Sequence, residues 1–151
     1  MQSHATTANY TEQWKAASGK AGIYYSSDYD DMPKYFMAHI AHAKSGEQRL
    51  YFLDQYIQDK NICKYESIIP EDITMIFNNQ AVKMSRWCKK FGDSATTYYS
   101  YTPQTDRGNT YVINLFKTAL LPIKIQLNNE IFIFPVTGFT KAWNSGGGNA
   151  I

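Results

Sequence analysis

Two segments in the C-terminal half, residues 73–84 and 123–134, restrict the possible folds more than any other part of the sequence. Each has an Asn-Asn pair flanked on both sides by residues that alternate between apolar and polar. Asparagine tolerates the positive φ angles that two-residue hairpin turns need, so both segments are predicted to be β-hairpins. The second half of the chain is therefore expected to form an antiparallel sheet.

Each predicted hairpin has one mainly apolar face, because the residues that flank a two-residue turn point to the same side. This face is expected to lie in the core. In the first hairpin it carries Ile73, Met75, Phe77, Gln80, Val82 and Met84, and in the second it carries Ile123, Ile125, Leu127, Glu130, Phe132 and Phe134.

The remaining elements are predicted from composition and spacing. Residues 95–101 and 109–118 are rich in β-branched and aromatic residues and are predicted to be strands, with a turn at 102–108. Shorter strands are predicted at 23–25 and 136–143. Helices are predicted at 10–17, 31–45 and 47–59, although the aromatic residues of the last segment also suit a strand. The expected fold is α+β, with N-terminal helices packed on a C-terminal antiparallel β-meander of about five or six strands.

Length and composition predict a single domain covering residues 1–151, with residues 1–9 and 144–151 flexible. The chain is 44% hydrophobic and 19% charged, which is typical of a globular protein. Its net charge of +2 argues against a protein that coats nucleic acid. The sequence has no run of about 18 apolar residues, so membrane insertion is not expected. No signal peptide is recognisable, and export would imply that one has been removed.

The two cysteines, Cys63 and Cys88, are predicted to form a disulfide. Their number is even, Cys63 lies in a polar stretch, and Cys88 continues the core-facing register of its predicted strand. Two buried thiols are the alternative, because free cysteine is among the most buried residue types. A disulfide implies an oxidising compartment, so a periplasmic or secreted protein is expected, with a cytoplasmic location as the alternative.

A binding face is predicted around the strand that carries Trp87. Lys83, Trp87 and Lys89 share the face opposite the apolar residues of that strand. Tyr99 and Tyr101 on a neighbouring strand could complete a platform on which bases or sugars stack, or which an acidic partner contacts. The alternative is that Trp87 packs under a helix while the lysines remain in solvent. Arg86 has the opposite register, which points it toward the core, where Asp72 or Glu130 could pair with it; the alternative is a bulge in the strand.

No metal site or cofactor is expected. His39 and His42 would share one face of a helix, and with a carboxylate such as Asp31 they could bind a metal. No pattern in the sequence, however, indicates that Asp31 or any other residue serves as the third ligand. Asp28, Asp30 and Asp31 lack the glycine and the distant glutamate of an EF-hand loop and are interpreted as a solvated turn.

The sequence contains no recognisable catalytic motif. The patterns of nucleophile elbows, nucleotide-binding loops and HExxH metal sites are all missing. The leading hypothesis is a non-catalytic binding protein of a bacterial envelope or secreted compartment, such as an inhibitor or immunity-type protein, that binds a protein partner. A glycan or nucleic-acid binder is the first alternative, with nucleic acid less expected, and a hydrolase using carboxylates or histidine is the second. The oligomeric state is not predicted.

Overall fold

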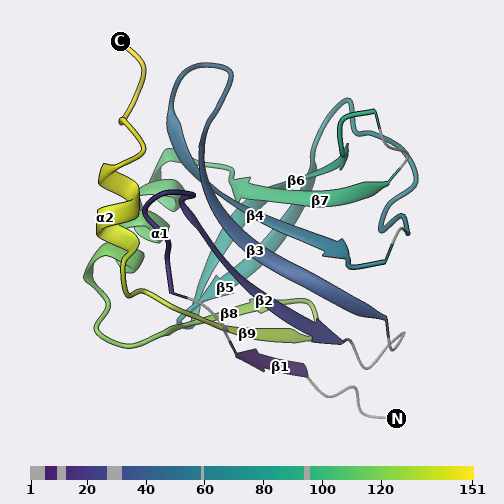
Figure 1. Cartoon of the computed structure of the whole chain (residues 1–151), viewed down its shortest axis with the longest axis horizontal. Coiled ribbons are helices and arrows are strands. Elements are labelled where there is room, and N and C mark those ends of the chain that lie inside the picture. Colours follow the sequence, from purple (N-terminus) through teal and green to yellow (C-terminus); the bar gives the residue numbers. More distant parts are fainter. Residues whose placement is uncertain (1–5, 10–12, 27–31, 59, 94–95) are drawn as a thin grey trace.

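The computed structural model describes residues 6–9, 13–26, 32–58, 60–93 and 96–151 and contains, within them, nine strands and two helices (Figure 1). The strands are β1 (Thr6–Asn9), β2 (Lys20–Ser26), β3 (Pro33–His42), β4 (Gln48–Tyr56), β5 (Glu71–Phe77), β6 (Gln80–Lys90), β7 (Thr97–Pro103), β8 (Ile123–Leu127) and β9 (Glu130–Phe134). The helices are α1 (Asp106–Thr118) and α2 (Phe139–Asn144).

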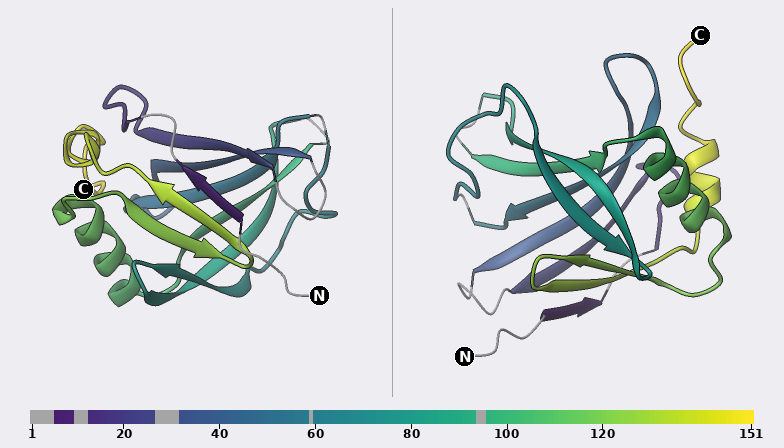
Figure 2. Two further views of the ribbon diagram at one scale, coloured as in Figure 1. Left: turned by 90° about the horizontal axis from the view of Figure 1, so that it is seen from below. Right: turned by 180° about the vertical axis from the view of Figure 1, so that it is seen from behind.

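The strands form one strongly curved sheet in the order β1-β9-β8-β5-β6-β7-β4-β3-β2. All neighbouring strands are antiparallel except β1, which runs parallel to β9. The sheet curls so far that β2 comes into contact with β1 and β9 from the opposite edge. Phe132 of β9 stacks on Phe36 of β3 with ring centroids 4.0 Å apart. The result is a nearly closed, barrel-like sheet (Figure 2).

The predicted arrangement of N-terminal helices on a C-terminal meander is wrong. The segments predicted as helices at 31–45 and 47–59 contain β3 and β4, and both helices of the described chain follow β7. Of the predicted helix at 10–17, residues 10–12 lie outside the described part of the chain, and Lys15 pairs with Lys20 around a turn. The predicted strand at 23–25 is present within β2.

The sequence of β4 does not show a strand pattern, because the inner face of this strand is not uniformly apolar. Its buried residues alternate strictly, but two of them, Gln48 and Asp54, are polar. The apolar residues alone therefore do not show the period of two that indicates a strand. In β3 the alternation is hidden differently, because Tyr35 and Met37 on the outer face are only partly exposed and resemble core residues in type.

The two segments predicted as strands at 109–118 and 136–143 instead contain most of α1 and most of α2. In α1 the buried residues Asn109, Val112, Ile113 and Phe116 follow helical spacing. The Thr105 side chain accepts a hydrogen bond from the Gly108 amide at 3.0 Å, which is a standard N-terminal cap. The packing of one apolar face thus outweighs the β-propensity of its tyrosine, valine and isoleucine residues.

Both predicted hairpins are confirmed, as β5–β6 and β8–β9. Asn78 and Asn79 have φ angles of 47° and 70°, and Asn128 has a φ angle of 54°. The register pairs Ile73 with Met84 in the first hairpin and Ile123 with Phe134 in the second. The predicted inner faces are therefore correct as well.

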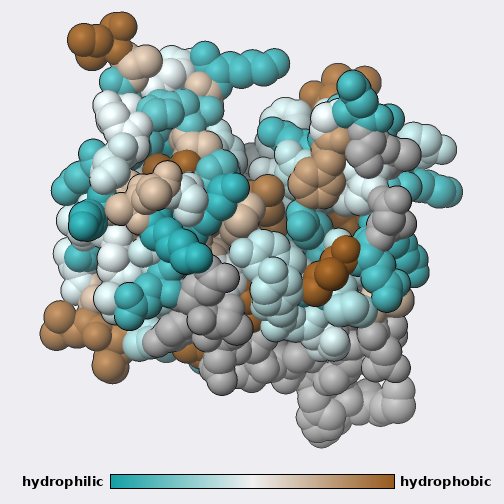
Figure 3. Space-filling view, in the orientation of Figure 1, coloured by the Kyte–Doolittle hydropathy of each residue, from teal (hydrophilic) through white to brown (hydrophobic). Residues whose placement is uncertain are grey.

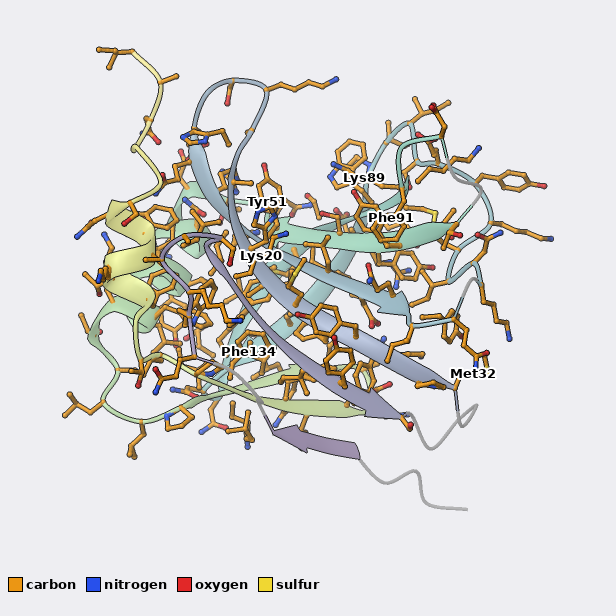
Figure 4. All side chains as sticks on the ribbon, viewed as in Figure 1. Lys20, Met32, Tyr51, Lys89, Phe91 and Phe134 are labelled. Atoms are coloured by element: carbon orange, nitrogen blue, oxygen red, sulfur yellow. A yellow bond between two sulfur atoms is a disulfide. The ribbon has the colours of Figure 1, made fainter. Side chains whose placement is uncertain are left out.

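The helices close one end of the curled sheet. Phe116 of α1 and Phe139 of α2 pack against each other and against Trp14, with ring centroids 5.0–5.8 Å apart. Phe134, labelled in Figure 4, reaches this cluster from inside the sheet and lies 6.4 Å from Phe116. At the other end of the sheet, the described residues that line the interior include charged side chains and tyrosines.

The glycine-rich C-terminal segment lies against the β3–β4 hairpin. The Gln48 side chain donates to the Trp143 carbonyl and accepts from the Gly148 amide, at 2.9 and 3.0 Å. The Ala150 amide donates to the Gly46 carbonyl at 2.8 Å. These bonds tie a segment with little side-chain content to the folded domain.

Candidate functional site at the open end of the sheet

The sheet divides the predicted binding platform between its two faces. Trp87 lies opposite Ser100 in the β6–β7 ladder, whereas Tyr99 lies opposite Cys88 and Tyr101 lies opposite Arg86. Side chains alternate along a strand, so Lys83, Trp87 and Lys89 point outward, while Tyr99 and Tyr101 point inward. Tyr101 is only 2% exposed. The structure therefore does not bring the five predicted residues together.

The inward tyrosines line a cavity of about 250 Å³ at the end of the sheet away from the helices. We call this cavity the mouth. Its aromatic lining comes from four tyrosines and one phenylalanine on strands β2, β4, β7 and β9, namely Tyr25, Tyr56, Tyr99, Tyr101 and Phe132. Its charged lining consists of two basic and two acidic residues, namely Lys34, Arg86, Asp54 and Glu130.

A buried carboxyl group lies at the centre of the polar lining. The Tyr25 hydroxyl donates a hydrogen bond to Oδ1 of Asp54 at 2.7 Å. Burial raises the pKa of Asp54 to about 7, while Glu130 also raises it and Tyr25 and Lys34 lower it. Burial, reinforced by the charge of Asp54, raises the pKa of Tyr25 as well. The Tyr25 hydroxyl therefore stays protonated and holds the Asp54 carboxyl in place.

Arg86 points into the sheet, as predicted, but its partner is Glu71 and not Asp72 or Glu130. Nη2 of Arg86 donates to Oε2 of Glu71 at 2.8 Å, across the β5–β6 ladder. The guanidinium carbon lies 4.4 Å from the centroid of the Tyr99 ring. Burial opposes the charge of Arg86, but Glu71 and the nearby tyrosines outweigh it, so the pKa of Arg86 is raised.

Asp54 and Glu130 are the two carboxylates that line the mouth, and a hydrolase of the kind considered above uses two. Asp54 is 7% exposed and already accepts the Tyr25 hydrogen bond. A carboxyl group that is buried and already hydrogen-bonded suits a structural role in the wall of the mouth better than proton exchange with a substrate.

Replacing Asp54 with asparagine is expected to remove a pH dependence of stability. The pKa of Asp54 rises from 3.8 to about 7 on folding, so the folded state holds a proton between these pH values that the unfolded state releases. The stability tied to this proton is fully present below pH 4 and is lost as the pH rises through 7. The Asp54→Asn variant should therefore gain on the order of 4 kcal/mol relative to the wild type between pH 4 and pH 8.

Urea unfolding of both proteins at several pH values measures this difference. Subtracting the two curves removes the contribution of all other titrating groups. Parallel curves across the whole range would contradict the assignment of a raised pKa to Asp54.

The predicted disulfide is present next to the mouth. Cys63 and Cys88 are bonded, with Cα atoms 6.0 Å apart. The Cys88 amide donates to the Ser67 side chain and the Ser67 amide donates to the Cys88 carbonyl, both at 2.9 Å. Thr97 on β7 hydrogen-bonds to the backbone of Cys63. We call residues 60–70 the stapled loop; its Ile62 lines the mouth.

The stapled loop exposes large apolar side chains. Ile68 is 94% exposed, and Ile69 and Tyr65 are each 77% exposed. Lys60 and Lys64 in the same loop are also exposed. Figure 3 shows hydrophobic and hydrophilic side chains intermixed at this corner of the molecule, upper right. Figure 4 shows Lys89 beside Phe91 at the same corner, at the end of β6.

The predicted histidine pair does not form a site. On strand β3, His39 and His42 point to opposite faces of the sheet, because their separation is odd. Burial, together with nearby Lys20, lowers the pKa of His39, and His42 hydrogen-bonds to the Gly148 carbonyl at 2.7 Å. Asp28, Asp30 and Asp31 lie outside the described residues. The described residues contain no cluster of three or more potential metal ligands.

Sequence reasoning missed the residues that meet in the mouth from β2, β4 and β9. Tyr25, Asp54 and Glu130 are far apart in the chain, and no local motif links them. The one signal available was Asp54 itself, an acidic residue flanked by Phe52, Leu53 and Tyr56.

No known protein family, characterised protein or solved structure matches this chain. In the described part of the chain, no helix is both long enough and apolar enough to span a bilayer.

Proposed function

We propose that this protein is a non-catalytic binding protein of an oxidising compartment, bacterial envelope or secreted, that binds a protein partner through its stapled loop. The observation that carries the proposal is the exposure of Ile68 and Ile69 on a loop that a disulfide holds against the sheet. An inhibitor or immunity-type role suits such a rigid binding surface. The disulfide is consistent with a location outside the cytoplasm.

The energetics of the stapled loop support binding. Two neighbouring isoleucines in water are unfavourable, and burying each one in an interface would contribute about 1.5–3 kcal/mol. The bonds from Ser67 and Thr97 hold the loop backbone before any partner arrives. A loop ordered in advance loses less conformational entropy on binding, so more of the burial energy becomes affinity.

The composition of the stapled loop also resembles that of protein interfaces. Tyr65 provides a large rigid ring with a polar tip, and aromatic residues are enriched at the centres of interfaces. The exposed charged residues of the loop are Lys60, Lys64 and Glu66. A partner with an apolar patch bordered by charges of both signs would complement this loop.

Replacing Ile68 and Ile69 with aspartate is expected to abolish partner binding without unfolding the protein. Both side chains are exposed, so the change should alter the free energy of unfolding by less than about 0.5 kcal/mol each. The partner is captured from the source organism on immobilised wild-type protein, identified, purified and titrated against both proteins by calorimetry. The variant should bind at least about 100-fold more weakly.

Leu120 and Leu121 provide a matched control. They are 96% and 76% exposed, nearly the same as the two isoleucines, but lie in the turn between α1 and β8 at the other side of the molecule. The Leu120→Asp/Leu121→Asp variant should bind the partner like the wild type. Equal loss in both variants would indicate nonspecific adhesion and would refute the proposal.

A further inference from the structure

We propose that the mouth is a binding site for a small, neutral, polyhydroxylated molecule, namely a single sugar ring. This inference does not depend on the proposed protein partner, because Ile68 and Ile69 do not line the cavity. It rests on the size, the charge balance and the hydrogen-bonding groups of the mouth.

The place and size of the cavity indicate a small ligand. Ligand sites in barrel-like sheets are commonly found where one end of the barrel stays open. Here the helices cover one end of the sheet (Figure 1). The residues that line the mouth come from the other end. Its volume of about 250 Å³ is below the roughly 300 Å³ at which pockets for drug-sized ligands begin. One ring with its substituents is therefore the largest ligand class that fits.

The charge balance of the mouth favours a neutral ligand. The lining carries two basic and two acidic side chains. Arg86 is bonded to Glu71, which lies outside the lining, and Lys34 lies close enough to Asp54 to affect its ionisation. The Nζ atom of Lys34 also lies 5.1 Å from the centroid of the Tyr56 ring. A ligand with a net charge would meet a similar number of attractive and repulsive groups. A neutral ligand would not disturb these pairs.

The hydrogen-bonding groups of the mouth suit hydroxyls. A hydroxyl can both donate and accept, so it can be inserted between donors and acceptors of either kind. Asp54 supplies an acceptor, and the Asn128 amide at the rim supplies both kinds of group. Among the described residues, Nε of Arg86 is buried and has no hydrogen-bond partner. A buried donor without a partner is costly, and a ligand hydroxyl would satisfy it.

The aromatic lining suits the other part of a sugar, its C–H groups. Tyr56 and Tyr99, both only partly buried, line the same cavity from β4 and β7. Rings of this kind bury large areas while their polar tips stay hydrated. Combined with dense hydrogen-bonding groups, they match a molecule that is apolar on its ring face and polar around its edge.

The test uses glucose, galactose and N-acetylglucosamine as probes, each at about 10 mM, with glutamate and lysine as charged controls. Binding to the full chain is followed by saturation-transfer NMR and by amide shift changes in the labelled protein. At least one sugar is expected to bind, with shift changes at Tyr25, Tyr99 and Asn128. The charged controls should bind more weakly.

Two mouth variants and one control locate the site. Tyr56→Ala removes one ring from the rim, and Asn128→Gly removes an amide while glycine retains the positive φ of that turn. Each should weaken sugar binding about tenfold. Trp87→Ala, on the outer face of the same sheet, should leave it unchanged.

Three results would overturn the inference. These are the absence of saturation transfer to all three sugars, tighter binding of glutamate or lysine, and sugar binding that is lost in Trp87→Ala but kept in both mouth variants. Loss of partner binding in the Ile68→Asp/Ile69→Asp variant with unchanged sugar binding would separate this site from the proposed protein interface.

Discussion

Replacing Phe36 with alanine should lower the free energy of unfolding by about 3–5 kcal/mol. Phe36 is fully buried in β3, stacks on Phe132 at 4.0 Å and lies edge-on to Phe134 at 5.8 Å. These contacts connect β3 with β9, strands that no ladder joins, so they hold the curled sheet closed. Urea unfolding followed by tyrosine and tryptophan fluorescence measures the change.

The Phe36→Leu variant distinguishes ring stacking from cavity formation. Leucine keeps most of the apolar volume, so this variant should lose less than half as much stability as the alanine variant. Phe91→Ala serves as the control for loss of an aromatic ring, because Phe91 is 38% exposed and should change stability little. A loss below about 1 kcal/mol in Phe36→Ala would contradict the stacking of β9 on β3.

Removing both cysteines should cost about 3.5 kcal/mol. Cys63 and Cys88 are 25 residues apart, and the chain-entropy model assigns about this value to a loop of that length. The Cys63→Ser/Cys88→Ser variant should show this loss, as measured by thermal and urea unfolding. Wild-type protein under reducing conditions should fall to nearly the same stability.

The same variant should also loosen the stapled loop. Without the bond, only the hydrogen bonds of Ser67, Thr97 and Asn61 hold residues 60–70 to the sheet. Amide hydrogen exchange in the loop should then accelerate, while the amides of β5 should still exchange slowly, through global unfolding only. Equal stability of oxidised and reduced wild-type protein would show that the disulfide does not constrain the chain.

The features predicted correctly from sequence depend on neighbouring residues. The β5–β6 and β8–β9 hairpins follow from their asparagine turns and their alternating flanks, because turn and pairing lie within a dozen residues. The register of Cys88 follows from that of Met84 in the same strand. Arg86 was placed inward for the same reason, although its partner Glu71 was not identified.

The features that were missed depend on packing between distant segments. Residues 109–118 have the composition of a strand, yet form α1 because one face covers the end of the sheet beside Phe134 and Trp14. Residues 48–56 resemble a helix because Gln48 and Asp54 interrupt the apolar alternation. The partners of these two residues, the C-terminal segment and Tyr25, are not adjacent in sequence, so their burial could not be anticipated.

The candidate site divides in the same way. Tyr99 and Tyr101 were recognised as candidates, but they were grouped with Trp87 and Lys89 on the opposite face. In the ladder, Tyr99 and Tyr101 lie opposite Cys88 and Arg86, whose side chains point inward, so the two tyrosines point inward as well. Only the register of β6 against β7 shows this. The mouth itself requires β2, β4, β7 and β9 to converge, which no local pattern specifies.

The sequence by itself determined the hairpins, the inner face of β5–β6 and the inward register of Cys88, because short-range turn chemistry and side-chain alternation are encoded in adjacent residues. Only the tertiary structure decided that the sheet curls, that the helices cover one end, and that charged and aromatic residues meet at the other. Those outcomes depend on which distant surfaces bury one another, and the free energy of that burial belongs to the whole chain and to no single segment.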